Sequence, residues 1–127
     1  MKLRYLLILL LCFLGASCSG REASAPPAST AAATHLEHAK AGNFAEGQLQ
    51  AHFLKHAYQF GDISQEDYLE DARALLNAPP DNDVLEKTRA NGDVLHYRRS
   101  TREFAVMASD GRIRTFFKAD ITYWMRQ

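Results

Sequence analysis

The proline pair Pro79-Pro80 divides the folded part of this chain into two different hydrophobic patterns. Before the prolines, apolar residues recur at three- and four-residue intervals, the period of an amphipathic helix. After them, short segments rich in β-branched and aromatic residues are separated by turn signals, a pattern typical of antiparallel strands. Because the helical segments precede the strands instead of alternating with them, the chain is expected to form an α+β domain.

Two helices are expected before the prolines. Apolar residues at mostly helical spacing predict the first helix at residues 44–60, and Gly61 is a good C-terminal stop. The second is expected at residues 65–77, because Ser64 is a favourable N-cap with an acidic residue three places later. The apolar face of this second helix indicates that it packs against another element.

Four strands are expected after the prolines, at residues 84–89, 94–99, 103–108 and 112–118. The dipeptides Asn91-Gly92 and Asp110-Gly111 are strong hairpin signals, since both can take the positive φ that tight turns need. The expected product is two helices packed on one face of a four-stranded antiparallel sheet. Core or near-core positions are predicted for Phe104, Val106, Phe116 and Trp124.

The first 34 residues indicate targeting. A short basic segment and an apolar stretch at residues 5–14 form a secretory signal peptide, too short to span a membrane as a mature anchor. The run Gly-Ala-Ser-Cys that ends at Cys18 resembles a bacterial lipobox, in which Cys18 would be lipidated; ordinary cleavage near residues 16–20 is the alternative. Residues 19–34, rich in Ser, Ala and Pro, lack the apolar side chains that ordering requires and are expected to form a tether.

Residues 35–127 are expected to form one small domain with one core. Both cysteines, Cys12 and Cys18, precede it, so this domain can contain no disulfide. Its charge is divided: residues 35–86 carry 3 basic and 10 acidic residues, whereas residues 87–127 carry 9 basic and 4 acidic ones. A basic half with interleaved aromatic residues fits an RNA-facing surface, and mutual neutralisation of the two halves is the alternative.

Several motifs then follow one another in a recognisable order. They are HFLKHAYQFG from His52, TREFAV from Thr101 and DGRIRTFFK from Asp110. This order resembles the C-terminal RNase toxin domains of contact-dependent inhibition and other polymorphic toxin systems, which are similar to the barnase, EndoU, colicin D and RelE-like nuclease superfamily. The resemblance covers roughly the last three-fifths of the chain. It implies a metal-independent endoribonuclease, with tRNA as the expected substrate and no cofactor.

Metal-independent RNA cleavage needs a base for the 2′-hydroxyl proton, an acid for the 5′-oxygen and cations for the phosphate charge. Histidine can be acid or base near neutral pH, because its ordinary pKa is about 6.5. On this logic His56 is the principal catalytic candidate and Lys55 its phosphate-binding neighbour, the pair that the resemblance also implies. The chain departs from colicin D at Phe53, where that enzyme has a second lysine.

The resemblance places Thr115 in the catalytic site, where its hydroxyl would orient a phosphate oxygen, while Phe117 would stack on a base or fill the core. Strict strand alternation puts Ile113, Thr115 and Phe117 on one face, and Arg114 and Lys118 on the other. The RNA-binding candidates are Thr101, Arg102, Arg112, Phe117 and Lys118. For each of these residues an ordinary surface or strand role is the alternative.

A zinc site is an alternative, because His52 and His56 are one helical turn apart and His35 and His38 are neighbours in sequence. Such a site needs a third protein ligand, and Phe53 replaces the glutamate of the H-E-x-x-H motif. No metal site is therefore predicted.

Together these features predict an exported toxin that acts in the cytoplasm of a target cell and remains in the producer as a periplasmic or outer-membrane lipoprotein. Its expected partners are RNA, an immunity protein and, through Cys18, the membrane; apart from the immunity complex it is expected to be a monomer. The alternative is a non-catalytic lipoprotein that uses an inherited nuclease-like fold for binding.

Overall fold

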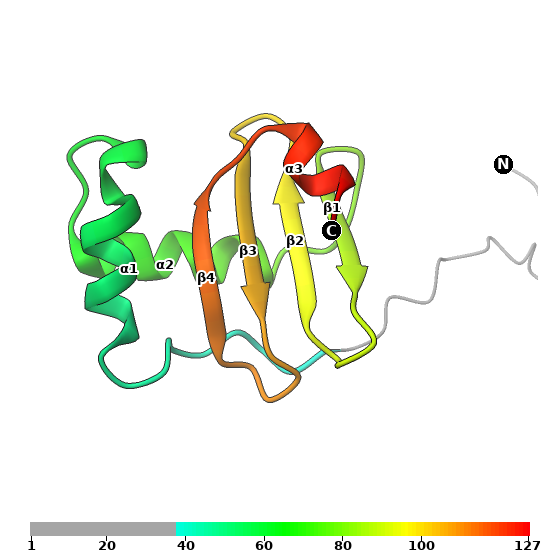
Figure 1. Cartoon of the computed structure of the whole chain (residues 1–127), viewed down its shortest axis with the longest axis horizontal. Coiled ribbons are helices and arrows are strands. Elements are labelled where there is room, and N and C mark those ends of the chain that lie inside the picture. The colour runs from blue at the N-terminus through cyan, green and yellow to red at the C-terminus, as the bar shows by residue number, and fades with distance from the viewer. Residues whose placement is uncertain (1–37) are drawn as a thin grey trace, which may run out of the picture. The chain divides into compact units, whose positions relative to one another are not determined.

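A computed structural model describes residues 38–127, in which helices accompany a four-stranded sheet (Figure 1). In chain order the elements are α1 (Gln48–His56), the 3-10 helix η1 (Ala57–Phe60), α2 (Gln65–Leu76), β1 (Val84–Thr88), β2 (Val94–Arg98), β3 (Glu103–Met107), β4 (Ile113–Lys118) and α3 (Ile121–Met125). The predicted α+β class is confirmed. The predicted signal peptide, Cys18 and the tether at residues 19–34 lie outside the described residues.

The strands form a meander in the order β1-β2-β3-β4, each antiparallel to its neighbours. Both predicted hairpin dipeptides lie in turns of this meander, and Gly92 and Gly111 adopt φ angles of 84° and 88° there. Such angles are costly for residues that carry a Cβ. At Gly111 the space is closed as well, since a Cβ would lie 2.5 Å from the carbonyl oxygen of Lys40. Each strand is one residue shorter than predicted.

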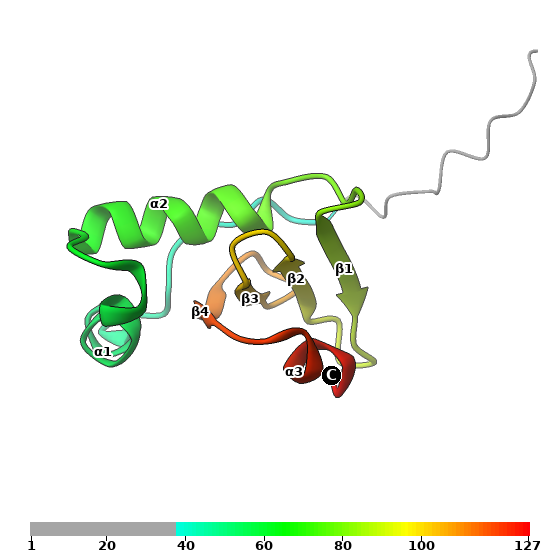
Figure 2. The ribbon, with the colours of Figure 1, turned by 90° about the horizontal axis from the view of Figure 1, so that it is seen from above.

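Helix α2 begins and ends close to the predicted residues. The backbone N–H of Asp67 donates to the Ser64 hydroxyl, which confirms the N-cap. The buried side of the helix presents Tyr68, Ala72 and Leu75 to the sheet. Figure 2 shows α2 lying across one face of the sheet, on the side opposite α3. This contact buries the larger of the two hydrophobic clusters.

Helix α1 differs from the prediction at both ends. It begins at Gln48 instead of residue 44, because Gly47 takes a left-handed φ of 72° and Phe44 forms an isolated parallel bridge with Ile113. At the other end the helix tightens into η1 before Gly61. In Figures 1 and 2, α1 runs beside β4 at the edge of the sheet. The C-terminal turn of α1 is thereby placed next to the last strand.

Helix α3 was not predicted. Asp120 caps it by accepting a hydrogen bond from the N–H of Tyr123, and Trp124 is buried against Tyr97, with ring centroids 5.8 Å apart. Its residues close a second hydrophobic cluster on the sheet face opposite α2. The predicted core positions Phe104, Val106, Phe116 and Trp124 are all buried, which confirms that prediction. Within residues 38–127, no helix is long and apolar enough to cross a membrane.

Candidate functional site

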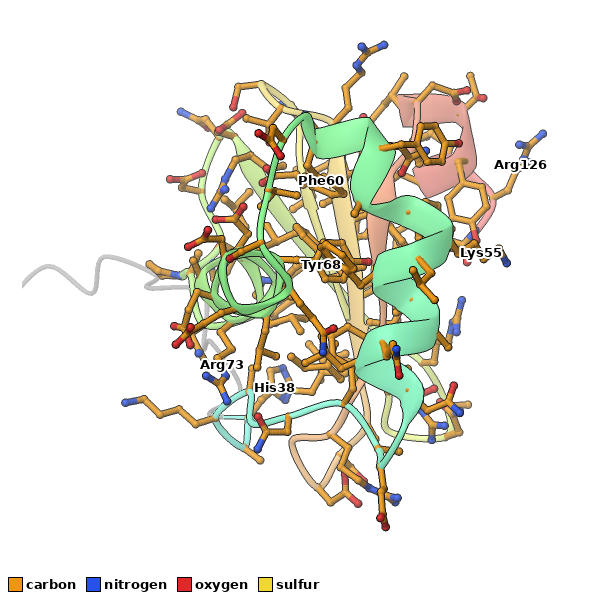
Figure 3. The ribbon with its side chains drawn as sticks, turned by 90° about the vertical axis from the view of Figure 1, so that its left-hand side faces the viewer. His38, Lys55, Phe60, Tyr68, Arg73 and Arg126 are labelled. Carbon is orange, nitrogen blue, oxygen red and sulfur yellow. The ribbon has the colours of Figure 1, made fainter. Side chains whose placement is uncertain are left out.

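The predicted catalytic pair lies in the last turn of α1, where this helix meets β4. The His56 ring stacks on Phe117, with centroids 5.2 Å apart and an interplanar angle of 23°. Neither ring nitrogen of His56 is hydrogen-bonded to another described residue, nor is the ammonium group of Lys55. In Figure 3, Lys55 points away from Tyr68 and towards the side where α3 and Arg126 lie. The pair therefore faces the side of the sheet that α2 leaves uncovered.

His56 is one member of a column of four rings. The Phe44 and His52 rings are 5.2 Å apart between centroids, and His52 and His56 are 6.0 Å apart with their planes at 21°. The helical i, i+4 spacing puts the two histidines one above the other, and Phe117 completes the column. The Nδ1 atom of His52 is buried without a hydrogen-bond partner among the described residues.

Both histidines of the column are held towards their neutral forms. Burial lowers the pKa of His56, and the charges of Lys55 and His52 lower it further. Burial also lowers the pKa of His52, with a smaller contribution from Lys55. A low-dielectric site with a neighbouring cation disfavours a second positive charge. Neutral imidazole is the form that can accept a proton from a substrate.

Strand β4 contains an irregularity that changes which side chains share a face. Its pairing with β3 shifts between Val106 and Met107, so that Thr115 lies opposite Val106 whereas Ile113 lies opposite Met107. Ile113 packs in the cluster under α2, while Phe117 belongs to the opposite cluster. The prediction that Ile113 shares a face with Thr115 and Phe117 is therefore wrong. A β-bulge adds one residue and reverses the alternation beyond it.

Arg114 is the extra residue at this bulge. Its guanidinium donates to the carboxylate of Asp93 over 2.9 Å, and that carboxylate is almost fully buried. Thr115 follows with a half-buried side chain, and its hydroxyl forms no hydrogen bond with the described residues. Thr115 therefore shares a face with Phe117, as predicted, and its hydroxyl is available to a ligand.

Two surface hollows lie at α1. One, of about 250 Å³, is lined by Gln48, Ala51, His52 and Lys55. The other, of about 210 Å³, shares Gln48 and is bordered by Arg112 and Arg114. Arg112 is paired there with Asp110 at 2.7 Å. Each hollow therefore has at least one basic side chain in its lining, which suits an anionic ligand.

Two other predicted RNA-binding residues lie together beyond η1. A hollow of about 340 Å³ is lined by Gln59, Arg102, Lys118, Ala119 and Asp120. Arg102 has a φ of 62°, the only positive φ of a non-glycine residue in the described part of the chain. The Lys118 ammonium lies 5.1 Å from the centre of the Phe60 ring. Thr101 is exposed in the turn that precedes β3. The predicted residues thus form two groups, one at the ring column and one at this hollow.

Many cations of the basic half serve the fold itself. The Lys87 ammonium lies 4.5 Å from the centre of the Trp124 ring and donates to the Trp124 carbonyl at 3.1 Å. Arg89 donates to the Gln127 side chain. Both cations therefore hold the C-terminal segment on the sheet, and the charge count overestimates what is free to bind phosphate.

Phe53 stands where the resemblance to colicin D implies a second lysine. Its ring meets Tyr68 edge-on at 5.8 Å and packs against the main core. A lysine at this place would bring an uncompensated charge to that core. The cation beside the two histidines is Lys55, and Arg112 and Arg114 border the adjoining hollow.

The sequence pointed to His52 only as a possible metal ligand and did not predict it as a neighbour of His56 in the candidate site. Its i, i+4 relation to His56 was the available signal. Among the described residues no group of three metal-ligating side chains could hold a metal ion. No protein-family model and no curated protein matches this chain.

Proposed function

We propose that this protein is an exported toxin whose C-terminal domain is an endoribonuclease. In this reaction the 2′-hydroxyl of RNA attacks the adjacent phosphorus and the bond to the 5′-oxygen breaks. The products are a 2′,3′-cyclic phosphate and a 5′-hydroxyl end, and no metal is required. The proposed substrate is tRNA, and the proposed regulator is an immunity protein.

One observation carries the proposal. His56 combines a lowered pKa with ring nitrogens that bond to no described residue, and it lies beside Lys55 and on the ring of Phe117. Because no described residue bonds to these nitrogens, they are accessible to a substrate. A hollow of about 250 Å³ lies on the same helix, and His52 and Lys55 are among the residues that line it.

Each neighbour has a role in this proposal. Lys55 supports the negative charge that develops on the phosphate. Phe117 supports the His56 ring by stacking on it, and the Thr115 hydroxyl orients a phosphate oxygen. Arg102 and Lys118 bind a more distant phosphate of the same RNA. Export through the N-terminal signal, with Cys18 as the lipid anchor, keeps the enzyme away from the RNA of its producer.

The test incubates the full-length protein with total cellular RNA in EDTA and analyses the fragments and their ends. We expect discrete tRNA fragments with cyclic phosphate ends from the wild type, and a loss of about 10²- to 10⁴-fold in rate for His56→Ala. Gln50→Ala is the matched control, since Gln50 is exposed on the same helix. RNA left intact by the wild type would favour a binding lipoprotein instead.

A further inference from the structure

His56 can carry out only one of the two proton transfers that the proposed reaction requires. One group must remove the 2′-hydroxyl proton, and a second must protonate the departing 5′-oxygen. The structure brings one further titratable ring against His56, that of His52, with the centroids 6.0 Å apart. The inference that follows rests on the proposed function and concerns the same site.

The environment of His52 suits proton transfer at one of its nitrogens. Nδ1 is buried and has no partner among the described residues. The ring also lines the hollow that Gln48 and Lys55 border. Nε2 is therefore the nitrogen that can exchange a proton with a ligand in this hollow. Since a proton on Nδ1 finds no described acceptor, the imidazolium form gives up a proton readily.

Lys55 lies between the two histidines on α1, and its charge acts on both rings. Arg112 and Arg114 border the adjoining hollow from the side of β4, where they are paired with the carboxylates of Asp110 and Asp93. The two remaining rings of the column, Phe44 and Phe117, are apolar. No carboxylate of the described residues forms a hydrogen bond with either histidine. The pair can therefore exchange its protons with a substrate without competition from a protein anion.

We propose that His52 and His56 are an acid–base pair that cleaves RNA. Neutral His56 accepts the proton of the 2′-hydroxyl, and the 2′-oxygen forms its bond to phosphorus. As the bond from phosphorus to the 5′-oxygen breaks, protonated His52 donates its Nε2 proton to that oxygen. The pair gains one proton and loses one, so that after cleavage His56 is protonated and His52 is neutral. Proton exchange with solvent then restores the starting state.

The assignment of His56 as the base agrees with its surroundings. Burial and the charges of Lys55 and His52 lower the pKa of His56, which favours the neutral form that a base needs. Burial lowers the pKa of both rings below the ordinary value of about 6.5. The pH–rate profile should therefore be bell-shaped, with its maximum below about pH 6.5.

A purely structural role for His52, as one ring in the column, makes different predictions. His52→Phe keeps the ring between Phe44 and His56 but carries no proton. Leu54→Phe is the matched control, because Leu54 is 75% exposed on the same helix. Thermal unfolding checks that each variant is folded, and His52→Gln provides a second variant that keeps a polar group.

The decisive experiment compares two forms of the RNA cut by the full-length protein, one with oxygen and one with sulfur at the 5′ position of the cleaved bond. A thiolate leaves without a proton, so the sulfur form does not need the acid. We expect His52→Phe to slow the oxygen form about 10²- to 10⁴-fold and the sulfur form less than about tenfold. His56→Ala should slow both forms.

Each remaining outcome overturns the proposal in a distinct way. Equal slowing of both forms by His52→Phe would give His52 a structural role and reject the pair alone. An unchanged rate for both forms would reject any role for His52. Wild-type protein that leaves the oxygen form intact would reject the proposed function, and the pair with it.

Discussion

Residues 38–127 contain two histidine clusters with opposite environments, one under α2 and one beside the edge strand β4. Under the C-terminal end of α2, His96 is fully buried: Nδ1 donates to the Leu75 carbonyl at 2.8 Å, and Nε2 lies 3.0 Å from the Glu86 carboxylate. The other Glu86 oxygen is 3.2 Å from His38. Beside β4, by contrast, the nitrogens of His52 and His56 bond to none of the described residues.

This contrast separates two uses of the same side chain. A histidine whose two nitrogens are satisfied by the protein joins elements together, as His96 joins β2 to α2 and β1. A histidine that is half-buried with free nitrogens contributes little to the fold but keeps its chemistry for a ligand. Burial lowers the pKa of His96 too, although the Leu75 carbonyl and Glu86 oppose this effect. A lowered pKa alone therefore does not distinguish the two clusters; their hydrogen bonds do.

The largest predicted effect is the difference in the free energy of unfolding between two variants, one that lacks His96 and one that lacks His56. His96→Ala leaves the Leu75 carbonyl without its donor and removes the contact with Glu86, so it should lower the free energy of unfolding by about 3 kcal/mol. His56→Ala should lower it by about 1 kcal/mol or less. Urea unfolding of both variants measures the difference. Equal losses would remove the distinction between the two clusters.

A smaller effect should come from the ring column itself. His52→Ala removes the ring between Phe44 and His56, and the loss of its aromatic contacts should cost about 1 kcal/mol. His52→Phe restores a ring and should recover most of this loss. Thermal unfolding of the two variants side by side gives the comparison. If both variants unfold together with the wild type, the stacking does not stabilise the helix against β4.

The smallest effect should be seen in the pH dependence of stability. The pKa values of His52, His56 and His96 are lowered in the folded protein, with burial as the main cause, so the unfolded chain binds more protons. The free energy of unfolding should therefore fall as the pH drops from 7 below about 6.5. His52→Phe removes one of these groups and should make the fall shallower. Urea unfolding at pH 7.5 and 5.5 checks both the sign and the difference.

Local signals predicted most of the fold. The cap at Ser64, the break at Pro79-Pro80 and the two hairpin dipeptides act through neighbouring residues, so α2 and the meander were predictable to within one or two residues. Helix α3 escaped prediction because its five residues depend on the burial of Trp124 against Tyr97. The start of α1 escaped it because Phe44 pairs with Ile113, far away in sequence.

By itself the sequence determined the fold class and the order of α1, α2 and the four strands, and it indicated Lys55, His56, Thr115 and Phe117 as candidate site residues. Only the tertiary structure decided that His52 and His56 stack in one column, that a bulge turns Thr115 away from Ile113, and that Phe53 belongs to the core. The physical reason is the separation along the chain between the residues that interact. Caps and turns depend on a few adjacent residues, whereas the register of β3 with β4 and the position of α1 against β4 depend on packing between distant parts of the chain.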